Sequence, residues 1–172
     1  SAGQELENLN NLITELDEKM GEMLDYAYSK EFGFLTSSPL NVGTGMKASV
    51  IVHLPALTMT GNLSKVLRII NNLGMSIRGV YGEGTQNQGD LYQISNNQTI
   101  GLSEKEIMLN VRNISEKIIE QERTARKFLG QKELELEDRV YRAYGLLTNA
   151  RKISSDECKK LISEVKLGVD LG

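Results

Sequence analysis

The chain has 172 residues, of which 40% are hydrophobic and 25% charged, and its formal net charge at pH 7 is −3. This length suffices for one domain with a substantial core, so we expect residues 1–172 to form a single domain. The small negative charge excludes a large basic field for nucleic acid or an anionic membrane, and no apolar run reaches the ~20 residues that span a bilayer. The single cysteine, Cys158, excludes an internal disulfide. A cytoplasmic protein fits these observations.

The first segment predicts one long amphipathic helix over residues 4–30. Its apolar residues alternate spacings of three and four, which places them on one stripe. They are Leu6, Leu9, Ile13, Leu16, Met20, Met23 and Ala27. Such a stripe needs a partner, and a bundle face or the flank of a sheet explains it more simply than a coiled coil.

The segment 32–95 predicts a sheet region. Residues 47–54 include three consecutive β-branched residues, which favours a strand that is buried on both faces. His53, the only histidine, falls on this strand, and we expect it to be packed in the core. A second strand is predicted to end at Gly79, and a third is predicted over residues 91–94.

A helix is predicted between the first two of these strands. Asn62 has a side chain suited to cap the helix at its start, and apolar residues follow on one side to about Leu73. Gly74 comes directly afterwards, where a residue with positive φ commonly ends a helix. We therefore expect a short helix that covers part of the sheet.

Two polar, glycine-rich segments interrupt the sheet region. The first, SSPLNVGTGMKA at residues 37–48, fits G-x-G-x-x-A, but a dinucleotide-binding fingerprint needs a helix after the glycines, and here a strand follows. It also lacks the spacing of a Walker A loop. Clustered backbone amides and the ammonium group of Lys47 still make a candidate phosphate site. The second segment, Gly82–Asp90, is long for a hairpin turn, so we expect a mobile functional loop.

The segment 103–167 predicts three helices. Two of them begin at a serine that is followed three residues later by a glutamate, which is the pattern of a capping box. We expect the helices over residues 103–129, 133–149 and 154–166. The predicted order is a helix, then strands with one helix between them, then three helices. This order indicates an α+β fold, with an antiparallel sheet flanked by helices.

Several separated segments carry a family resemblance. They are FGFLTSSPLNVGTGMKASVIVHLP, IRGVYGEGTQNQGDLYQIS and IGLSEKEI, in this order along the chain. Together they resemble the catalytic domain of the ATP:guanido phosphotransferases, the family of creatine and arginine kinases. The segment RGVYGEG and the helical tail are most similar to the bacterial protein arginine kinases of that family, so the resemblance covers about residues 32–172.

The resemblance implies transfer of the γ-phosphoryl group of ATP to a guanidinium nitrogen of arginine in substrate proteins, within a stress response. Phosphoryl transfer depends on in-line positioning and on cations around the equatorial oxygens. The implied cofactors are ATP and Mg²⁺ held through the nucleotide, and the implied partners are arginine-containing proteins. We expect no membrane and no direct nucleic-acid partner, and a homodimer is compatible with the resemblance.

The resemblance also implies roles for individual residues. Its phosphate-binding positions are Lys47, Ala48, Ser49, Arg78, Gly79, Tyr81, Gly82 and Glu83. Its loop positions are Asn41, Gly43, Thr44 and Gly45, and its catalytic positions are Ser38, Glu83 and Gln86. We expect Lys47 and Arg78 to face one anion site beside the Asn41–Gly45 loop, although without the resemblance both would pass as solvated cations at strand ends.

Four positions depart from the family pattern. Ser38 replaces a cysteine whose thiolate contacts the guanidinium group, and Leu40 replaces the hydroxyl residue that supports it. Lys47 stands where the family has an arginine, so the charge is kept but the bidentate fork is not. Gln86 stands where the family has a glutamate. If that carboxylate is the general base, its loss costs about 10²- to 10⁴-fold in rate, and Glu83 is the nearest carboxylate that could replace it.

Two hypotheses follow from these departures. The first is an enzyme, the C-terminal catalytic portion of a protein arginine kinase. The second is a catalytically degraded module that binds nucleotide or acts as an adaptor. The family's further phosphate-binding arginines and one acidic guanidinium ligand belong upstream of the matched region, and a phosphoarginine-reading motif belongs after it. We therefore expect this chain to hold about half an active site and to be inactive alone.

Overall fold

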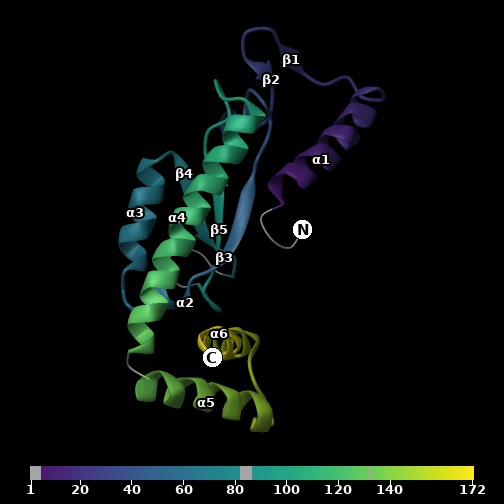
Figure 1. The fold of residues 1–172 in the computed structure, drawn as a ribbon. Coiled ribbons are helices and arrows are strands. Elements are labelled where there is room, and N and C mark those ends of the chain that lie inside the picture. The colour runs from purple at the N-terminus through teal and green to yellow at the C-terminus, as the bar shows by residue number, and fades with distance from the viewer. Residues whose placement is uncertain (1–4, 82–86, 132) are drawn as a thin grey trace.

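The structure is a computed structural model, and it describes residues 5–81, 87–131 and 133–172. Within these residues three strands form an antiparallel sheet in the order β3-β5-β4 (Figure 1). Ile51, Gln93 and Arg78 stand opposite one another in one row across it. The strands are β3 (Ser49–His53), β4 (Met75–Gly79) and β5 (Leu91–Asn96). The predicted strands are confirmed, and the third is two residues longer than expected.

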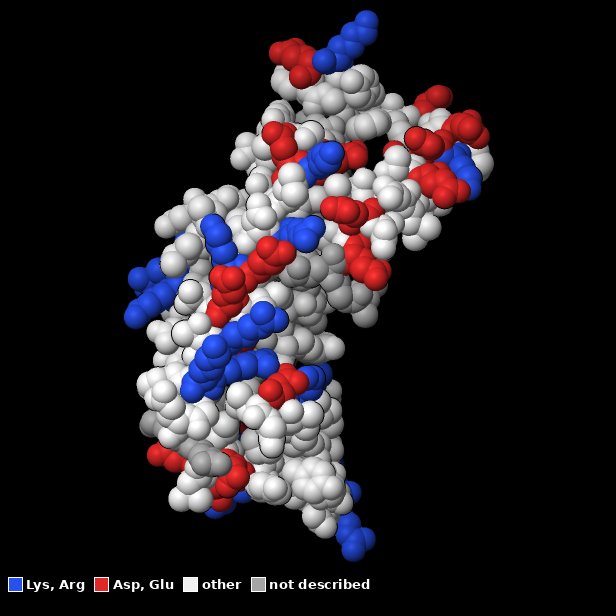
Figure 2. Space-filling model, in the orientation of Figure 1, with Lys and Arg blue, Asp and Glu red and all other residues white. Residues whose placement is uncertain are grey.

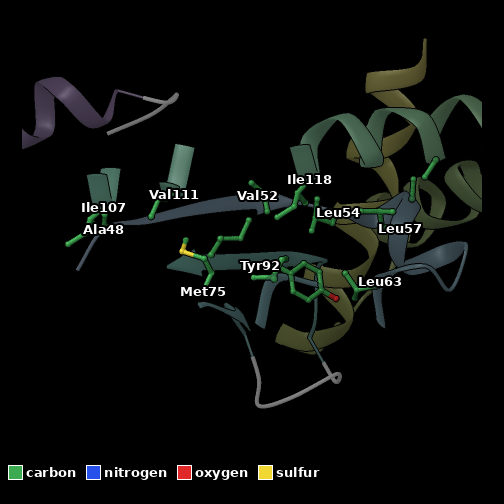
Figure 3. Packing of buried hydrophobic residues seen from close by; sticks show 14 residues of the cluster. Ala48, Val52, Leu54, Leu57, Leu63, Met75, Tyr92, Ile107, Val111 and Ile118 are labelled. Carbon is green, nitrogen blue, oxygen red and sulfur yellow. The ribbon is translucent and has the colours of Figure 1, made fainter. Parts of the chain in front are cut away.

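One face of the sheet is covered by helices. α4 (Glu104–Gly130) lies along β3 and β5, and α3 (Leu63–Asn72) packs on β4 (Figure 1). Apolar residues of α4 recur at spacings of four and seven and therefore all face the strands. Figure 3 shows the buried side chains between these elements, among them Ala48, Val52, Leu54, Leu63, Met75, Tyr92, Ile107, Val111 and Ile118. This arrangement confirms the α+β class with an antiparallel sheet flanked by helices.

On the opposite face of the sheet Ile51 and Arg78 are exposed, whereas Ser95 is buried, and we call this face the open face. Its residues are Ser49, Ile51, Ser76, Arg78, Gln93 and Ser95, which alternate along the strands with the core residues. Ile51 is 57% exposed, so the prediction that the first strand is buried on both faces is wrong. The reason is that the β-branched run supplies one core row, while the residue between its two valines faces away from α4.

The first helix is shorter than predicted. α1 (Leu6–Gly21) ends at a glycine, which is a weak helix former, instead of continuing to residue 30. Further on, β1 (Tyr28–Ser29) and β2 (Gly33–Phe34) form a small hairpin, and the rings of Tyr28 and Phe34 meet edge to face at 5.3 Å. This pairing uses backbone groups that a longer helix would have needed.

The apolar stripe of α1 has little cover among the described residues. Leu6 packs against the core near α4. By contrast Ile13 is 60% exposed, and Met23, beyond the end of the helix, is 82% exposed. The described part of the chain therefore does not supply the partner that the stripe predicts.

The connection after β3 contains one helix that the sequence patterns did not predict. Pro55 begins α2 (Pro55–Met59), because proline fits a first turn where no N–H donor is needed. Asn62 stands at the N-cap position of α3, but its side chain donates to Thr60 Oγ1 at 3.2 Å and does not cap the helix. Gly74 adopts a φ of +72° directly after α3, as predicted.

The C-terminal helices begin at the predicted serines. Ser103 Oγ accepts a hydrogen bond from the N–H of Glu106, and the carboxylate of Glu106 accepts one from the N–H of Ser103 at 2.8 Å, which completes the capping box. Ser154 Oγ accepts from the N–H of Glu157 at 3.2 Å. α5 (Glu133–Asn149) has its predicted bounds, whereas α6 (Ser155–Leu171) continues beyond its predicted end at residue 166.

α5 and α6 pack against each other beyond one end of the sheet (Figure 1). A Cβ atom on Gly168 would lie 2.5 Å from Cγ1 of Val140, so the two helices approach to a distance that only glycine permits. Across the described residues, no helix has both the length and the apolar character to cross a membrane. Figure 2 shows Lys and Arg side chains over α4 interspersed with Asp and Glu; Arg112 and Glu116, for example, form an ion pair at 3.1 Å.

Candidate functional site

The open face carries a polar network across all three strands. Ser49, Ser95 and Ser76 stand opposite one another, and the hydroxyls of Ser76 and Ser95 lie 2.8 Å apart. The side chain of Gln93, one row further along, donates from Nε2 to Ser49 Oγ at 2.9 Å. Arg78 stands beside Gln93 in that row and is exposed. The face thus carries hydroxyl and amide groups next to Arg78, which has no ion-pair partner among the described residues, and this combination can bind a phosphorylated ligand.

The side chain of Thr99 holds the glycine-rich loop before β3 by hydrogen bonds to its backbone. The buried hydroxyl of Thr99 lies 2.9 Å from the carbonyl oxygen of Leu40 and 2.7 Å from that of Val42, so its proton serves both acceptors. Gly43 forms a two-way backbone bridge with Phe34. With a φ of +112°, and with the carbonyl oxygen of Thr99 3.0 Å from the place of a Cβ, position 43 accepts only glycine.

Asn96, at the end of β5, holds the backbone on both sides of Lys47. Its Oδ1 accepts from the N–H of Ala48 at 2.8 Å, and its Nδ2 donates to the carbonyl oxygen of Met46 at 3.1 Å. Ala48 is buried, whereas Lys47 is exposed. If the strand alternation is continued back from Ser49, the side chain of Lys47 belongs to the open face.

The other predicted loop residues lie near this point. Ser38 precedes the short 3-10 helix η1 (Pro39–Asn41), and its carbonyl oxygen accepts from the N–H of Asn41 at 3.0 Å. Thr44 Oγ1 accepts from the N–H of Met46 at 3.3 Å. Gly45 adopts a φ of +67°, a conformation that glycine takes without strain.

The structure places Lys47 and Arg78 toward opposite ends of the same face. Because β3 and β4 run in the same direction, the loop before β3 and the loop after β4 lie at opposite ends of the sheet. By strand geometry Lys47 and Arg78 are separated by about 13 Å along the strands and about 10 Å across them. We had expected Arg78 to lie beside the Asn41–Gly45 loop, and this expectation is wrong. An elongated ligand lying across the open face could contact both cations.

The second predicted segment, Gly82–Asp90, follows Tyr81, and its predicted residues Gly82, Glu83 and Gln86 lie outside the described residues. The described residues on either side of these three are Tyr81 and residues 87–90; they lie together, and we call them the neck. The N–H of Tyr81 donates to Asn87 Oδ1 at 3.3 Å, and the N–H of Gln88 donates to the carbonyl oxygen of Tyr81 at 3.2 Å. Gly79 is also required here, because a Cβ on it would lie 2.7 Å from Cβ of Asn87.

His53 is partly buried and hydrogen-bonded, but it alternates with the core residue Val52 and lies on the same side of β3 as Ile51, so the expectation that it packs in the core is wrong. Its Nε2 lies 2.8 Å from Ser163 Oγ, and the same hydroxyl donates to Asp90 Oδ2 at 2.7 Å. A serine hydroxyl has one proton, so Ser163 must accept from His53, which fixes the proton on Nε2. Burial lowers the pKa of His53 below its usual 6.5, and the nearby Arg126 lowers it further.

The described residues of this site include few side chains of the types that bind metal ions. Among the described residues, no three His, Cys, Asp or Glu side chains are grouped so that they could hold a metal ion. The residues that support the site were also missed by sequence reasoning: Asn96 and Thr99 follow a strand that was predicted to stop at residue 94. Their only signal was the polar run SNNQT directly after that strand.

The chain is similar to one enzyme family along nearly its whole length. Residues 1–125 match the ATP:guanido phosphotransferase C-terminal catalytic domain, and residues 133–172 match the protein-arginine kinase McsB C-terminal domain. The protein-arginine kinase of Halothermothrix orenii is 49% identical over 171 residues, which are 99% of this chain and 49% of that protein. The protein-arginine kinase of Bacillus subtilis is 48% identical over 159 residues, which are 92% of this chain and 44% of that protein. The chain thus spans about half the length of the curated relatives it matches.

Solved structures agree with this assignment. A lombricine kinase has a TM-score of 0.54 and 28% identity, covering 68% of this chain and 32% of that one. The duplicated taurocyamine kinase from Schistosoma mansoni, with bound components of a transition state analog, has a TM-score of 0.55 and 30% identity. That match covers 64% of this chain and 15% of the taurocyamine kinase chain.

Proposed function

Because this chain belongs to the ATP:guanido phosphotransferase family, we propose that its full-length gene product transfers the γ-phosphoryl group of ATP to the guanidinium group of arginine in proteins. One observation carries the proposal. The similarity to proteins named protein-arginine kinase runs through both the sheet region and the α5–α6 pair, at 49% identity over 99% of the chain. A chain that shared only the nucleotide-binding part would not match in α5 and α6.

The open face gives this proposal a physical basis. Lys47, beside the Asn41–Gly45 loop, would bind phosphate oxygens at one end of a nucleotide, and Arg78 would bind them further along the face. Catalysis of phosphoryl transfer consists mostly of such positioning and charge stabilisation. Mg²⁺ would arrive bound to the nucleotide phosphates.

A second function is supported by the residues that stand at the predicted catalytic positions. Ser38 carries a hydroxyl where a thiolate is expected, and Leu40 is an exposed apolar residue beside it. Neither can balance the charge of a guanidinium group. On this evidence the alternative is a nucleotide-binding or adaptor module that keeps the fold without catalysis.

Incubation of the full-length gene product with radiolabelled ATP and an arginine-rich acceptor protein separates the two functions. The kinase proposal expects acid-labile label on arginine. The adaptor alternative expects ATP binding by calorimetry without any labelled acceptor. The 172-residue chain, tested in parallel, is expected to transfer no label by itself, since it spans about half of its relatives.

A further inference from the structure

One face of α6 carries four polar residues at helical spacing. They are Lys159, Ser163, Lys166 and Asp170, which follow one another at intervals of four, three and four and so share one face. This face points toward the end of the sheet where the neck lies, because Ser163 contacts both His53 and Asp90. α6 is therefore in a position to act on the neck.

Lys159 touches both sides of the neck. Its ammonium nitrogen lies 4.5 Å from the centre of the Tyr81 ring, which is a favourable cation–π contact. Its carbonyl oxygen lies 3.2 Å from the place that a Cβ on Gly89 would take. Gly89 has a φ of +81°, so a glycine lets the neck pass close to the helix backbone.

Ser163 holds the last residue of the neck in an unusual conformation. Asp90 has a φ of +52° and is the one non-glycine residue with positive φ in the described part of the chain. Ser163 donates to its carboxylate, and the N–H of Leu54 donates to its carbonyl oxygen at 2.8 Å. Backbone in this region is sparsely populated and persists where the surroundings hold it.

α6 is itself mounted on the covered side of the molecule. Asp170 accepts from Nη1 of Arg126 at 2.9 Å, and Nε of Arg126 donates to Glu122 at 2.7 Å. The buried carboxylate of Glu122 also accepts from the N–H groups of Ala56 and Leu57, at 3.0 and 2.9 Å, at the start of α2. These contacts hold α6 against α4 and α2, so the helix that contacts the neck is itself fixed to the core.

We propose that Lys159 and Ser163 are positioning residues that fix the neck of the β4–β5 loop for phosphoryl transfer. The neck is continuous with Arg78, because Asn87 of the neck packs on Gly79. Release of the neck from α6 would let Arg78 move relative to the rest of the open face. The contact between α6 and the neck stands on the geometry alone, and its effect on transfer rests on the proposed function.

The test uses the full-length gene product and two paired substitutions. Lys159→Met removes the charge over the Tyr81 ring and keeps the aliphatic stem, whereas Lys159→Arg retains a cation. Ser163→Ala removes the hydroxyl, whereas Ser163→Thr retains it. Lys160→Met is the matched control, because Lys160 is exposed and adjacent on the same helix.

Amide hydrogen exchange measures the neck directly. In Lys159→Met and Ser163→Ala the amides of Tyr81 and Gln88 are expected to exchange about tenfold faster, with the amides of α4 unchanged. Lys159→Arg, Ser163→Thr and Lys160→Met are expected to exchange like the parent protein. Unchanged exchange in both disrupting variants would overturn the contact, as would equal acceleration in Lys160→Met.

Steady-state kinetics measures the consequence for transfer. The disrupting variants are expected to lose about tenfold or more in kcat with little change in the KM for ATP, and the conservative variants are expected to restore kcat. A tenfold rise in the KM for ATP in the disrupting variants, with kcat unchanged, would overturn the positioning role. A parent protein that transfers nothing, while its variants show the expected exchange pattern, would overturn the proposed function and leave the contact between α6 and the neck standing.

Discussion

Asn96 holds Lys47 in place by binding the chain on either side of it. The N–H of Ala48 donates to Asn96 Oδ1 at 2.8 Å, and Asn96 Nδ2 donates to the carbonyl oxygen of Met46 at 3.1 Å. Asn96 is only 7% exposed, so these bonds are shielded from water. A cation on a fixed backbone loses less conformational freedom when it binds a ligand, which favours binding.

The first prediction concerns these two hydrogen bonds of Asn96, which we call the Asn96 bracket. Asn96→Ala leaves the N–H of Ala48 and the carbonyl of Met46 without their side-chain partner, and we expect unfolding free energy to fall by about 1–3 kcal/mol. ATP binding should weaken as well, because Lys47 is no longer held. The control is Asn97→Ala at the exposed neighbouring position, which should stay within about 0.5 kcal/mol of the parent. Denaturant unfolding and calorimetry with ATP check both effects, and an Asn96→Ala protein with parental ATP affinity would contradict the bracket's role in binding.

The elements that follow from local patterns were predicted well from the sequence. α5 has its predicted bounds, and the capping box at Ser103 forms as expected, because a cap depends on residues three positions apart. The end of α1 was missed, since its stop at Gly21 comes with a hairpin around Phe34 that no periodicity encodes. Burial of the first strand was also misjudged, because a β-branched run does not tell how many faces are covered.

The candidate site was predicted only in part, for a related reason. The residues near Lys47 were found through motifs, but their supports lie far away in sequence. Asn96 is 48 residues from Ala48, and Thr99 is 57 residues from Val42. No local pattern links such pairs. The positions of Lys47 and Arg78 at opposite ends of one face likewise depend on strand order, which the sequence alone left open.

The second prediction concerns the contact between α5 and α6. Gly168→Ala would place a Cβ 2.5 Å from Cγ1 of Val140, so the helices must separate, and we expect a loss of about 1–3 kcal/mol in unfolding free energy. The double change Gly168→Ala with Val140→Ala should cost less than the sum of the single changes, since the clash is gone. Thermal and denaturant unfolding measure these differences, and strict additivity would contradict the close approach.

A matched glycine provides the control for that experiment. Gly145 lies inside α5, and a Cβ there would meet no atom within 4 Å. Gly145→Ala should therefore stabilise the protein by about 0.5–1 kcal/mol through its higher helix propensity. Destabilisation by both glycine changes would point to a general intolerance of α5 and α6 instead of the specific contact.

The third prediction concerns pH. The pKa of His53 is lowered by burial and by Arg126, against the opposing effects of Asp90, Glu122 and Asp170, so the unfolded chain binds a proton more readily than the folded one. Stability should be fully present above the unfolded pKa of about 6.5 and should decline as pH falls from there toward the lower folded pKa. His53→Gln keeps an N–H donor near Ser163 but does not titrate, so its stability should decline less over the same range. Equal pH dependence of parent and variant, measured by denaturant unfolding, would refute the assignment, because the chain has no second histidine.

The fourth prediction separates a working active site from a degraded one. If Ser38, Lys47 and Gln86 are tolerated changes at a working site, then Ser38→Cys, Lys47→Arg and Gln86→Glu in the full-length gene product should each raise phosphoryl transfer. Each change restores a charge or a bidentate fork that the transition state can use.

The combination of these changes is the sharper test. Residues that act as one unit give non-additive effects, so the triple change should exceed the product of the single gains if the rest of the site is intact. If the protein is an adaptor, even the triple variant should transfer no phosphate to arginine, because other parts of the site would have changed as well. The readout is acid-labile label on an arginine-rich acceptor. Ordinary kinase activity in the unmodified protein would show instead that Ser38, Lys47 and Gln86 are compatible with catalysis, and would leave Glu83 or a carboxylate outside this chain to bind the guanidinium group.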